Sequence, residues 1–271
     1  MSSKPLDCGI SGSLPGDADN TENTPVDKIE PAKVRHTPIF GNSFILDVIE
    51  DSGMMNVEKS LNVYFLLSQV LLQKIPGEVA ELGCYMGHTA VIIQKTIQQC
   101  KSDKLLHVFD SFEGLPPKDI KDGQTQFQGG WCATTSEQVI SKCRKFEVPI
   151  PIMHPGWFEH TLERQLPRSI AFAHLDGDFY SSIMVSLEHI YPRLSPGAVV
   201  VIDDYFDPAV HPEIEKKLNS NTKNRQRNIS YKLIDILPGV KRACDEFFAD
   251  KPEKVEALIS GHETHGYFRK K

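Results

Sequence analysis

Two pairs of aspartates stand directly after two apolar runs in the stretch IAFAHLDGDFYSSIMVSLEHIYPRLSPGAVVVIDDY. Asp176 and Asp178 follow the first run, and Asp203 and Asp204 follow the second. Four carboxylates brought together repel one another unless protons or a cation intervene. Carboxylate oxygens are also the donors that hard cations such as Mg²⁺ prefer. If the fold gathers both pairs, these residues predict a magnesium-type metal site.

The segment between the two pairs indicates how the fold gathers them. Apolar residues recur at helical spacing between Ser182 and Leu194, and Ser195-Pro196-Gly197 ends that helix. A strand, a helix and a second strand of this length predict a parallel crossover, so both strands end at the same edge of one sheet. Ligands bind open α/β sheets at that edge. The alternative is that Asp178 only caps the following helix, but two aspartate pairs at one edge favour the metal.

A second segment predicts a cofactor-binding corner. In GEVAELGCYMGHTAVIIQKTI, a strand over 78–82 is followed by a turn with Gly83 and Gly87 and by a helix over 89–97. Glycines let a ligand approach backbone amides closely at the start of a helix. The turn lacks both the GxGxxG pattern and the GK[ST] of a nucleotide loop. An ordinary strand–helix turn therefore remains open as the alternative.

The acidic end of the next strand strengthens the cofactor hypothesis. Asp110 follows an apolar strand over 105–109, at about the distance from the glycine turn where a carboxylate grips a ribose diol. A turn or cap residue is the alternative for Asp110 taken alone. Strand, glycine turn and acidic strand end together favour an adenosyl-type cofactor. The polar segment 118–135, with Phe127 and Trp131, predicts a lid or binding loop beside it.

Composition limits the possible partners and the domain organisation. The net charge of −6 and the pI of about 5.9 argue against a nucleic-acid surface. The six cysteines form no CxxC pair, which is typical of reduced thiols in a cytoplasmic protein. No apolar run approaches the roughly 20 residues of a membrane span. Residues 1–34 are polar and predict a disordered tail, and residues 35–271 predict one domain.

The remaining pattern predicts the elements around the sheet. Apolar spacing favours helices, and the last two apolar stretches favour a closing antiparallel strand pair. The predicted helices cover 57–73, 136–146, 182–194, 208–218 and 240–248, and a short helix spans the region from Phe40 to Ile49. The predicted strands include 151–154 and the closing pair 254–259 and 266–269.

Several segments, in order along the chain, carry a resemblance to a known family. They are PGEVAELGCYMGHTA, FDSFEGLPP, PGWFEHTL, LDGDFYSSIMVSLEHIYPRLSPGAVVVIDDY and PGVKRACDEFF. The chain resembles the TylF/MycF (macrocin-type) O-methyltransferases, which act on deoxysugars of natural products and depend on S-adenosylmethionine and magnesium. The resemblance implies the α/β fold of class I methyltransferases, a Rossmann-like, seven-stranded, mostly parallel sheet with helices on both faces. It also implies a homo-oligomer, a dimer or larger.

The resemblance assigns roles residue by residue. The methionine end of the cofactor falls to Glu81, Gly83 and Gly87, and its ribose to Asp110 and Ser111. The metal ligands are Asp176, Asp203 and Asp204, and the general base is Asp178. The chain departs from the family in the bulkier glycine corner GCYMGHT.

The expected activity is transfer of a methyl group from S-adenosylmethionine to a hydroxyl of a small-molecule acceptor, as in a deoxysugar. A metal bound by two adjacent hydroxyls lowers the pKa of the attacking one, and a nearby carboxylate takes its proton. Asp176-Gly177-Asp178 also spells the DxD of a metal-dependent glycosyltransferase, which is the enzymatic alternative. A non-catalytic, methyltransferase-like binding protein is the third hypothesis. The sequence does not specify the acceptor.

Overall fold

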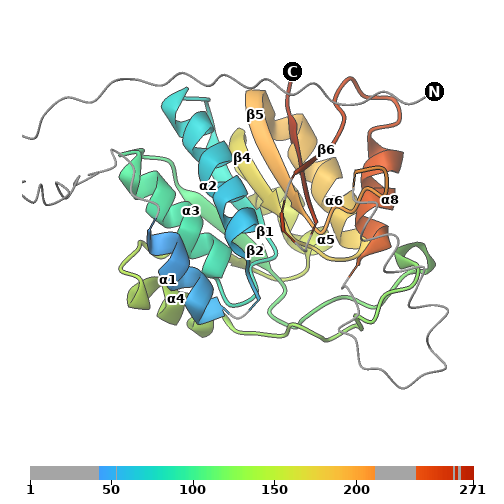
Figure 1. The fold of residues 1–271 in the computed structure, drawn as a ribbon, viewed down its shortest axis with the longest axis horizontal. Helices are drawn as coiled ribbons and strands as arrows, with labels where there is room; N and C mark the ends of the chain where they lie inside the picture. The colour runs from blue at the N-terminus through green and yellow to red at the C-terminus, as the bar shows by residue number, and fades with distance from the viewer. Residues whose placement is uncertain (1–42, 53, 211–235, 259, 262–263) are drawn as a thin grey trace, which may run out of the picture. The chain divides into compact units, whose positions relative to one another are not determined.

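A seven-stranded sheet forms the centre of the unit that spans Ile39–Lys271 (Figure 1). Its strand order is β3-β2-β1-β4-β5-β7-β6. The strands are β1 (Glu78–Leu82), β2 (Leu106–Asp110), β3 (Ile152–Pro155), β4 (Ile170–Leu175), β5 (Leu194–Asp203), β6 (Glu256–Leu258) and β7 (His265–Arg269). The first five are parallel, and β7 runs antiparallel to both β5 and β6. The predicted fold class and the closing antiparallel pair are therefore confirmed.

Helices cover both faces of the sheet because its central strands are apolar on both sides. Along β5, Val199 and Val201 pack on one side, whereas Val200 and Ile202 pack on the other. The first side is covered by α1 (Phe44–Ser52), α2 (Val57–Leu72), α3 (His88–Gln99) and α4 (Ser136–Lys145) (Figure 1). The second is covered by α5 (Phe158–Gln165), α6 (Tyr180–Ile190) and α8 (Pro238–Phe247).

The computed structural model describes residues 43–52, 54–210, 236–258, 260–261 and 264–271. The predicted tail over 1–34 lies outside the described residues, as does most of the predicted helix over 208–218. Within the described part, no helix is both long and apolar enough to span a membrane.

The crossover between β4 and β5 differs from its prediction in the bounds of the helix and in the start of β5. The helix ends at Ile190 and a 3₁₀ turn, η2, covers Tyr191–Arg193. Pro192 lacks the N–H that a continuing helix would need, which explains the early end. Ser195-Pro196-Gly197 then belongs to β5 and does not precede it, because Gly197 N donates to the Lys270 carbonyl at 2.8 Å.

Candidate functional site

The carboxyl ends of the parallel strands open into one cavity of about 840 Å³. Its lining combines both predicted regions of the site. The sequence-predicted residues that line it are Gly83, Asp110, Ser111, Asp176, Asp178, Asp203 and Asp204. The crossover thus brings the two aspartate pairs together, as the parallel strands β4 and β5 require.

Three of the aspartates form a compact group. Asp176, Asp178 and Asp204 each offer one carboxylate oxygen, and these oxygens lie within 4.8 Å of one another. Burial, and then the neighbouring carboxylates, hold the pKa of Asp176 and of Asp178 well above the usual range. Asp178 and Asp204 have φ of 60° and 55°, a region that non-glycine residues adopt mainly at strained or functional positions. Oxygen donors that repel one another fit a hard divalent cation.

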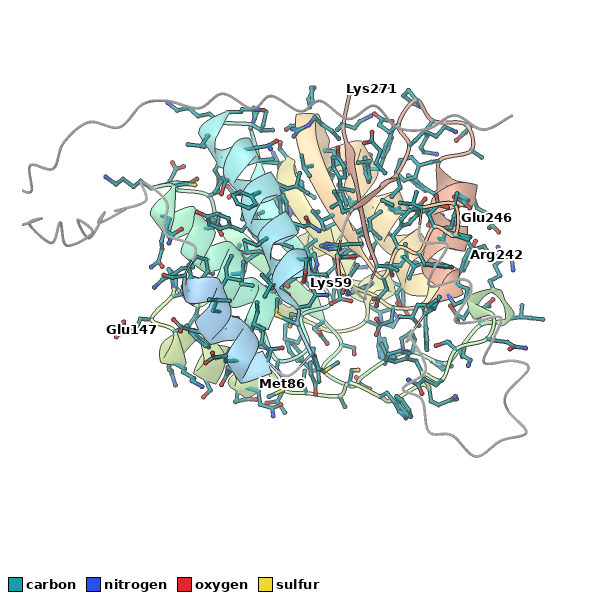
Figure 2. The ribbon with its side chains drawn as sticks, in the orientation of Figure 1. Lys59, Met86, Glu147, Arg242, Glu246 and Lys271 are labelled. Carbon is teal, nitrogen blue, oxygen red and sulfur yellow. The ribbon has the colours of Figure 1, made fainter. Side chains whose placement is uncertain are left out.

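Asp203 lies beside that group, and its charge contributes to the raised pKa values of Asp176 and Asp178. One of its oxygens lies within 4.8 Å of donor atoms of His174 and His265, and Asp203 Oδ1 lies 2.8 Å from Lys59 Nζ. The same ammonium lies 3.1 Å from Asp204 Oδ1. Burial raises the pKa of Asp203, but the charges of Lys59 and the two histidines outweigh it and lower that pKa below its ordinary value. Figure 2 shows Lys59 near the start of α2, beside the sheet. The compact group contains Asp178, whereas the family resemblance implies Asp203 as a ligand beside Asp176 and Asp204, and that assignment stays a prediction.

Asp110 is held by backbone amides. Asp110 Oδ2 accepts hydrogen bonds from the N–H groups of Cys84 (2.8 Å) and Tyr85 (3.1 Å), and Oδ1 accepts from Phe112 N (2.8 Å). The side chain thus ties the end of β2 to the glycine turn after β1. Ser111 Oγ accepts from Glu113 N at 3.1 Å and donates to the Gly114 carbonyl at 2.9 Å. Both residues remain at the cavity wall, where their predicted ribose contacts stay predictions.

Close packing explains why both turn positions are glycine. A Cβ on Gly83 would lie 1.9 Å from the Asp176 carbonyl oxygen, so only glycine lets the ends of β1 and β4 approach this closely. A Cβ on Gly87 would lie 2.9 Å from a methyl of Val139 on α4. Gly87 also has φ of 84°, which favours glycine at the start of α3. Gly87 itself does not belong to the cavity lining that the described residues form.

Glu81 lies beneath the cavity and not in its lining. Its carboxyl group is fully buried, and neither oxygen has a hydrogen-bond partner among the described residues. His174 Nδ1 lies 3.5 Å from Glu81 Oε1. Burial raises the pKa of Glu81. Its predicted contact with the methionine end of a cofactor would have to pass through His174, which does line the cavity.

Asp122 supplies the cap that the sequence offered as an alternative for Asp178. The N-cap of α6 is Phe179, without a side-chain hydrogen bond, and Asp122 Oδ1 accepts from Tyr180 N at 2.6 Å. Asp122 belongs to η1 (Ile120–Asp122) in the predicted binding loop, so that loop is fastened to the helix behind the acids. The capping alternative for Asp178 thus loses its structural basis.

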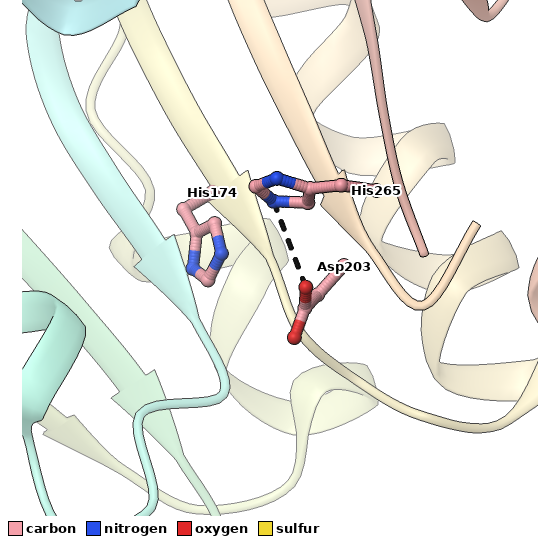
Figure 3. Close-up of side chains that lie close together, drawn as sticks. All are labelled: His174, Asp203 and His265. Carbon is pink, nitrogen blue, oxygen red and sulfur yellow. Dashed lines mark ion pairs between the residues drawn. The ribbon is translucent and has the colours of Figure 1, made fainter. Parts of the chain in front are cut away.

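Among the lining side chains that sequence reasoning missed are Lys59, Cys132, His174 and His265 (Figure 3 shows the two histidines). His174 had a signal, since it stands two residues before Asp176 on the same face of a strand. Cys132 lies in the predicted binding loop, and its burial, followed by the charges of Asp178 and the other acids, raises its pKa to about 11. The thiol is therefore protonated at neutral pH and a poor nucleophile.

Comparison with known proteins gives two curated relatives among others. The chain is 29% identical over 161 residues to 8-demethyl-8-(2,3-dimethoxy-alpha-L-rhamnosyl)-tetracenomycin-C 4'-O-methyltransferase of Streptomyces olivaceus, covering 56% of this chain and 62% of that relative. It is 27% identical over 175 residues to mycinamicin III 3''-O-methyltransferase of Micromonospora griseorubida, covering 60% and 68%.

Solved structures share the fold at low sequence identity. The O-methyltransferase NovP superposes with a TM-score of 0.59 at 22% identity, covering 79% of this chain and 80% of NovP. An O-methyltransferase from Bacillus cereus in complex with SAH gives a TM-score of 0.51 at 12% identity, covering 86% and 92%. Both likenesses establish a class I methyltransferase fold. Residues 26–237, more than half of the chain, match the Macrocin-O-methyltransferase (TylF) family, and the protein therefore belongs to that family.

Proposed function

We propose that this protein is a metal-dependent O-methyltransferase that moves a methyl group from S-adenosylmethionine to a hydroxyl of a sugar in a natural product. One observation carries the proposal. Asp110, whose carboxylate is held by backbone N–H groups, lines the same cavity as the group Asp176, Asp178 and Asp204. A cofactor bound at the first would face an acceptor bound at the second. Family membership supports the same reaction.

The residues of the proposed site divide the work. Asp176, Asp203 and Asp204 would hold Mg²⁺, as the family resemblance implies, and Asp178 offers an oxygen within 4.8 Å of oxygens of Asp176 and Asp204. When bound, Mg²⁺ lowers the pKa of a hydroxyl that it coordinates, and S-adenosylmethionine provides the electrophilic methyl group. Asp178 accepts the hydroxyl proton as general base, from a position beside the acids that would hold the metal. The glycine turn and Asp110 fix the cofactor, so catalysis depends mainly on positioning.

The proposed acceptor is a neutral glycoside. One curated relative is named as an O-methyltransferase of a rhamnosyl derivative of tetracenomycin C, and the other as an O-methyltransferase of mycinamicin III. The cavity lining adds apolar side chains that suit the aglycone or the face of a sugar ring, namely Met54, Met55, Phe127, Trp157 and Phe158.

The assembly and location that we propose are a homo-oligomer in the cytoplasm. Leu46, Phe65 and Leu72 on α1 and α2 are more than half exposed, which suits a subunit contact. The five described cysteines are free thiols, which suits a reducing compartment.

The decisive experiment combines binding with turnover. Calorimetry should detect S-adenosylmethionine binding, whereas UDP-glucose as a nucleotide-sugar probe should not bind. Mass spectrometry across a panel of O-glycosides, beginning with rhamnosides, should then find a product heavier by one CH₂ unit, formed with Mg²⁺ and abolished by EDTA. Binding of UDP-glucose in place of S-adenosylmethionine would support the glycosyltransferase instead. Cofactor binding without any methylated product would support a non-catalytic binding protein.

A further inference from the structure

Asp178, the general base of the proposed function, lies in a strained turn directly before α6. Phe179 N donates to the Gly177 carbonyl at 2.6 Å across Asp178, whose φ is 60°. These features define a γ-turn with a positive φ at its centre, which is the rarer and more strained form of that turn. Strained backbone of this kind persists only where the surrounding structure holds it. The turn therefore depends on contacts that fix it from outside.

Two contacts fix the turn where it enters α6. The Phe179 side chain is fully buried in the apolar cluster on the second side of the sheet. The next N–H group, that of Tyr180, donates to Asp122 Oδ1 at 2.6 Å. Phe179, the N-cap residue of α6, makes no side-chain hydrogen bond, so Asp122 caps the helix from another part of the chain. Asp122 is 1% exposed, and its other oxygen accepts from Asp119 N at 2.7 Å, which fixes the orientation of the carboxylate.

The first turn of α8 leaves room for Asp122. A Cβ on Gly239 would overlap Asp122 Oδ1 and would lie 3.0 Å from Tyr180 N and 3.1 Å from Asp122 Cα. The φ of Gly239 lies outside the left-handed region, so its backbone conformation is open to other residues. The close approach of Asp122 is therefore the reason that this position needs glycine. This contact also gives a role to the segment PGVKRACDEFF, which the proposed function leaves without one.

Asp122 belongs to the binding loop, which also forms part of the cavity wall. The loop returns on itself where Leu115 N donates to the Trp131 carbonyl and Gly130 N donates to the Leu115 carbonyl, both at 2.8 Å. Between these contacts, Phe127 lines the cavity and packs against the apolar cluster on the second side of the sheet. A displacement of the loop that broke the Asp122 contact would therefore loosen the cavity wall and the turn of the general base together.

We propose that Asp122 is a positioning residue for the general base, which is held in place only while the binding loop is docked on α6 and α8. Asp122 lies outside the cavity lining that the described residues form, and it acts through Tyr180 N on the turn that carries Asp178. Coupling of this kind ties proton transfer to the closed state of the loop. The role of Asp178 rests on the proposed function, whereas the dependence of its turn on Asp122 can be measured without turnover.

Hydrogen exchange of the full chain, followed by mass spectrometry, tests the coupling directly. Asp122→Ala removes the cap, and Gly239→Ala displaces Asp122 from Tyr180 N while keeping its carboxylate. Both should speed exchange in 177–183 about tenfold or more, because a hydrogen bond to a charged acceptor is lost. Lys121→Met is the matched control. Lys121 is the neighbouring residue, and its Nζ donates at the surface to Tyr180 Oη (2.7 Å) and Glu246 Oε2 (2.8 Å) without contacting Tyr180 N. Its exchange in 177–183 should match that of wild type.

Turnover shows what the positioned turn contributes to catalysis. With Mg²⁺ and an O-rhamnoside that wild type methylates, kcat of Asp122→Ala and of Gly239→Ala should fall about 10²-fold, because the base is misplaced. The S-adenosylmethionine affinity, measured by calorimetry, should stay close to that of wild type, since Asp110 is held by other amides. A merely structural role for Asp122 would instead lower cofactor binding and turnover together.

Several results would overturn the proposal. They are unchanged exchange in 177–183 in folded Asp122→Ala and Gly239→Ala, an equal increase in Lys121→Met, or faster exchange at unchanged kcat. Additive effects in the variant with both Asp122→Ala and Gly239→Ala would also overturn it, because substitutions that break one shared contact are not additive. Circular dichroism checks folding, and Gly239→Ala decides alone if Asp122→Ala does not fold. Wild type without turnover on any glycoside would reject the proposed function, while exchange still decides whether Asp122 holds the turn.

Discussion

The two halves of the cavity are built in opposite ways. On the side of β1 and β2, Asp110 is satisfied by three backbone amides, and the glycine turn fits closely against its neighbours. On the side of β4 and β5, carboxylates face carboxylates, and the pKa values of Asp176 and Asp178 are raised by burial and mutual repulsion. The first half is complete in the chain alone, whereas the second requires a cation or protons.

This difference shows which interactions hold each half of the cavity in shape. Backbone hydrogen bonds hold the cofactor corner, so its shape should persist without ligand. The acidic half is balanced only in part by Lys59, which contacts Asp203 and Asp204. Its geometry should therefore depend on metal and on charge. The predictions below test whether the two halves respond as differently as they are built.

The largest loss of stability is expected at Gly83, where the two halves of the cavity are in contact. Gly83→Ala would place a Cβ 1.9 Å from the Asp176 carbonyl at a φ of 87°. Backbone strain and overlap together should destabilise the fold by about 4–6 kcal/mol. The control is Gly130→Ala, whose φ of 80° is similar but whose Cβ would meet nothing within 4 Å. Denaturant unfolding should show a much smaller loss for Gly130→Ala. Equal losses would mean that φ alone matters and that the two halves are not in close contact.

Asp178→Asn tests the acidic half without altering its shape. The substitution removes the proton acceptor, and kcat should fall about 10²–10⁴-fold. S-adenosylmethionine affinity, measured by calorimetry, should stay close to that of wild type because the cofactor corner is separate. Raising the pH should restore part of the rate, since the acceptor hydroxyl then loses its proton with less help. A rate within about twofold of wild type would show that Asp178 is not the proton acceptor.

The sequence predicted some features of the two halves and not others, and the reason is physical. β1 was predicted with its observed bounds, because Gly83 closes the strand. The convergence of the aspartates followed from the parallel crossover alone. Lys59 could not be predicted as the counter-ion, since its contact with Asp204 joins residues 145 positions apart. Nor could the position of His265 beside Asp203, because His265 lies on the antiparallel strand β7.

Magnesium should stabilise the protein through the acidic half alone. A ligand present at 100 times its Kd adds about 2.7 kcal/mol of stability, so Mg²⁺ should raise the Tm of metal-free wild type. Asp204→Asn should lose most of this gain. Asp110→Asn, which leaves the acidic group intact, should keep it. A gain that survives in Asp204→Asn would show that Mg²⁺ acts elsewhere on the chain.

Asp110→Asn should damage the other half. The new amide presents N–H donors to backbone N–H groups of Cys84, Tyr85 or Phe112 and leaves at least one of them unpaired. The expected cost is about 1.5–3 kcal/mol in stability, with cofactor affinity weakened about tenfold or more. Thermal unfolding and calorimetry measure the two effects. Weakened cofactor binding at unchanged stability would mean that Asp110 contacts the ligand without holding the turn.

The smallest effect concerns Asp51, which fastens α1 to the cofactor side of the molecule. Its carboxylate pairs with Lys142 and Lys145 of α4 and lies 3.2 Å from His88 Nε2. Hydrogen bonds from Lys142, then Lys145, lower its pKa below the usual 3.8. A lowered pKa contributes stability above the unfolded value, and that stability is lost as the pH falls through the folded value. Asp51→Asn should therefore cost about 1–2 kcal/mol at neutral pH, and its unfolding free energy should fall less steeply than that of wild type below about pH 4. If the unfolding free energies of the two proteins fall equally steeply below about pH 4, Asp51 contributes no pH-dependent stability. Packing alone would then hold α1 in place.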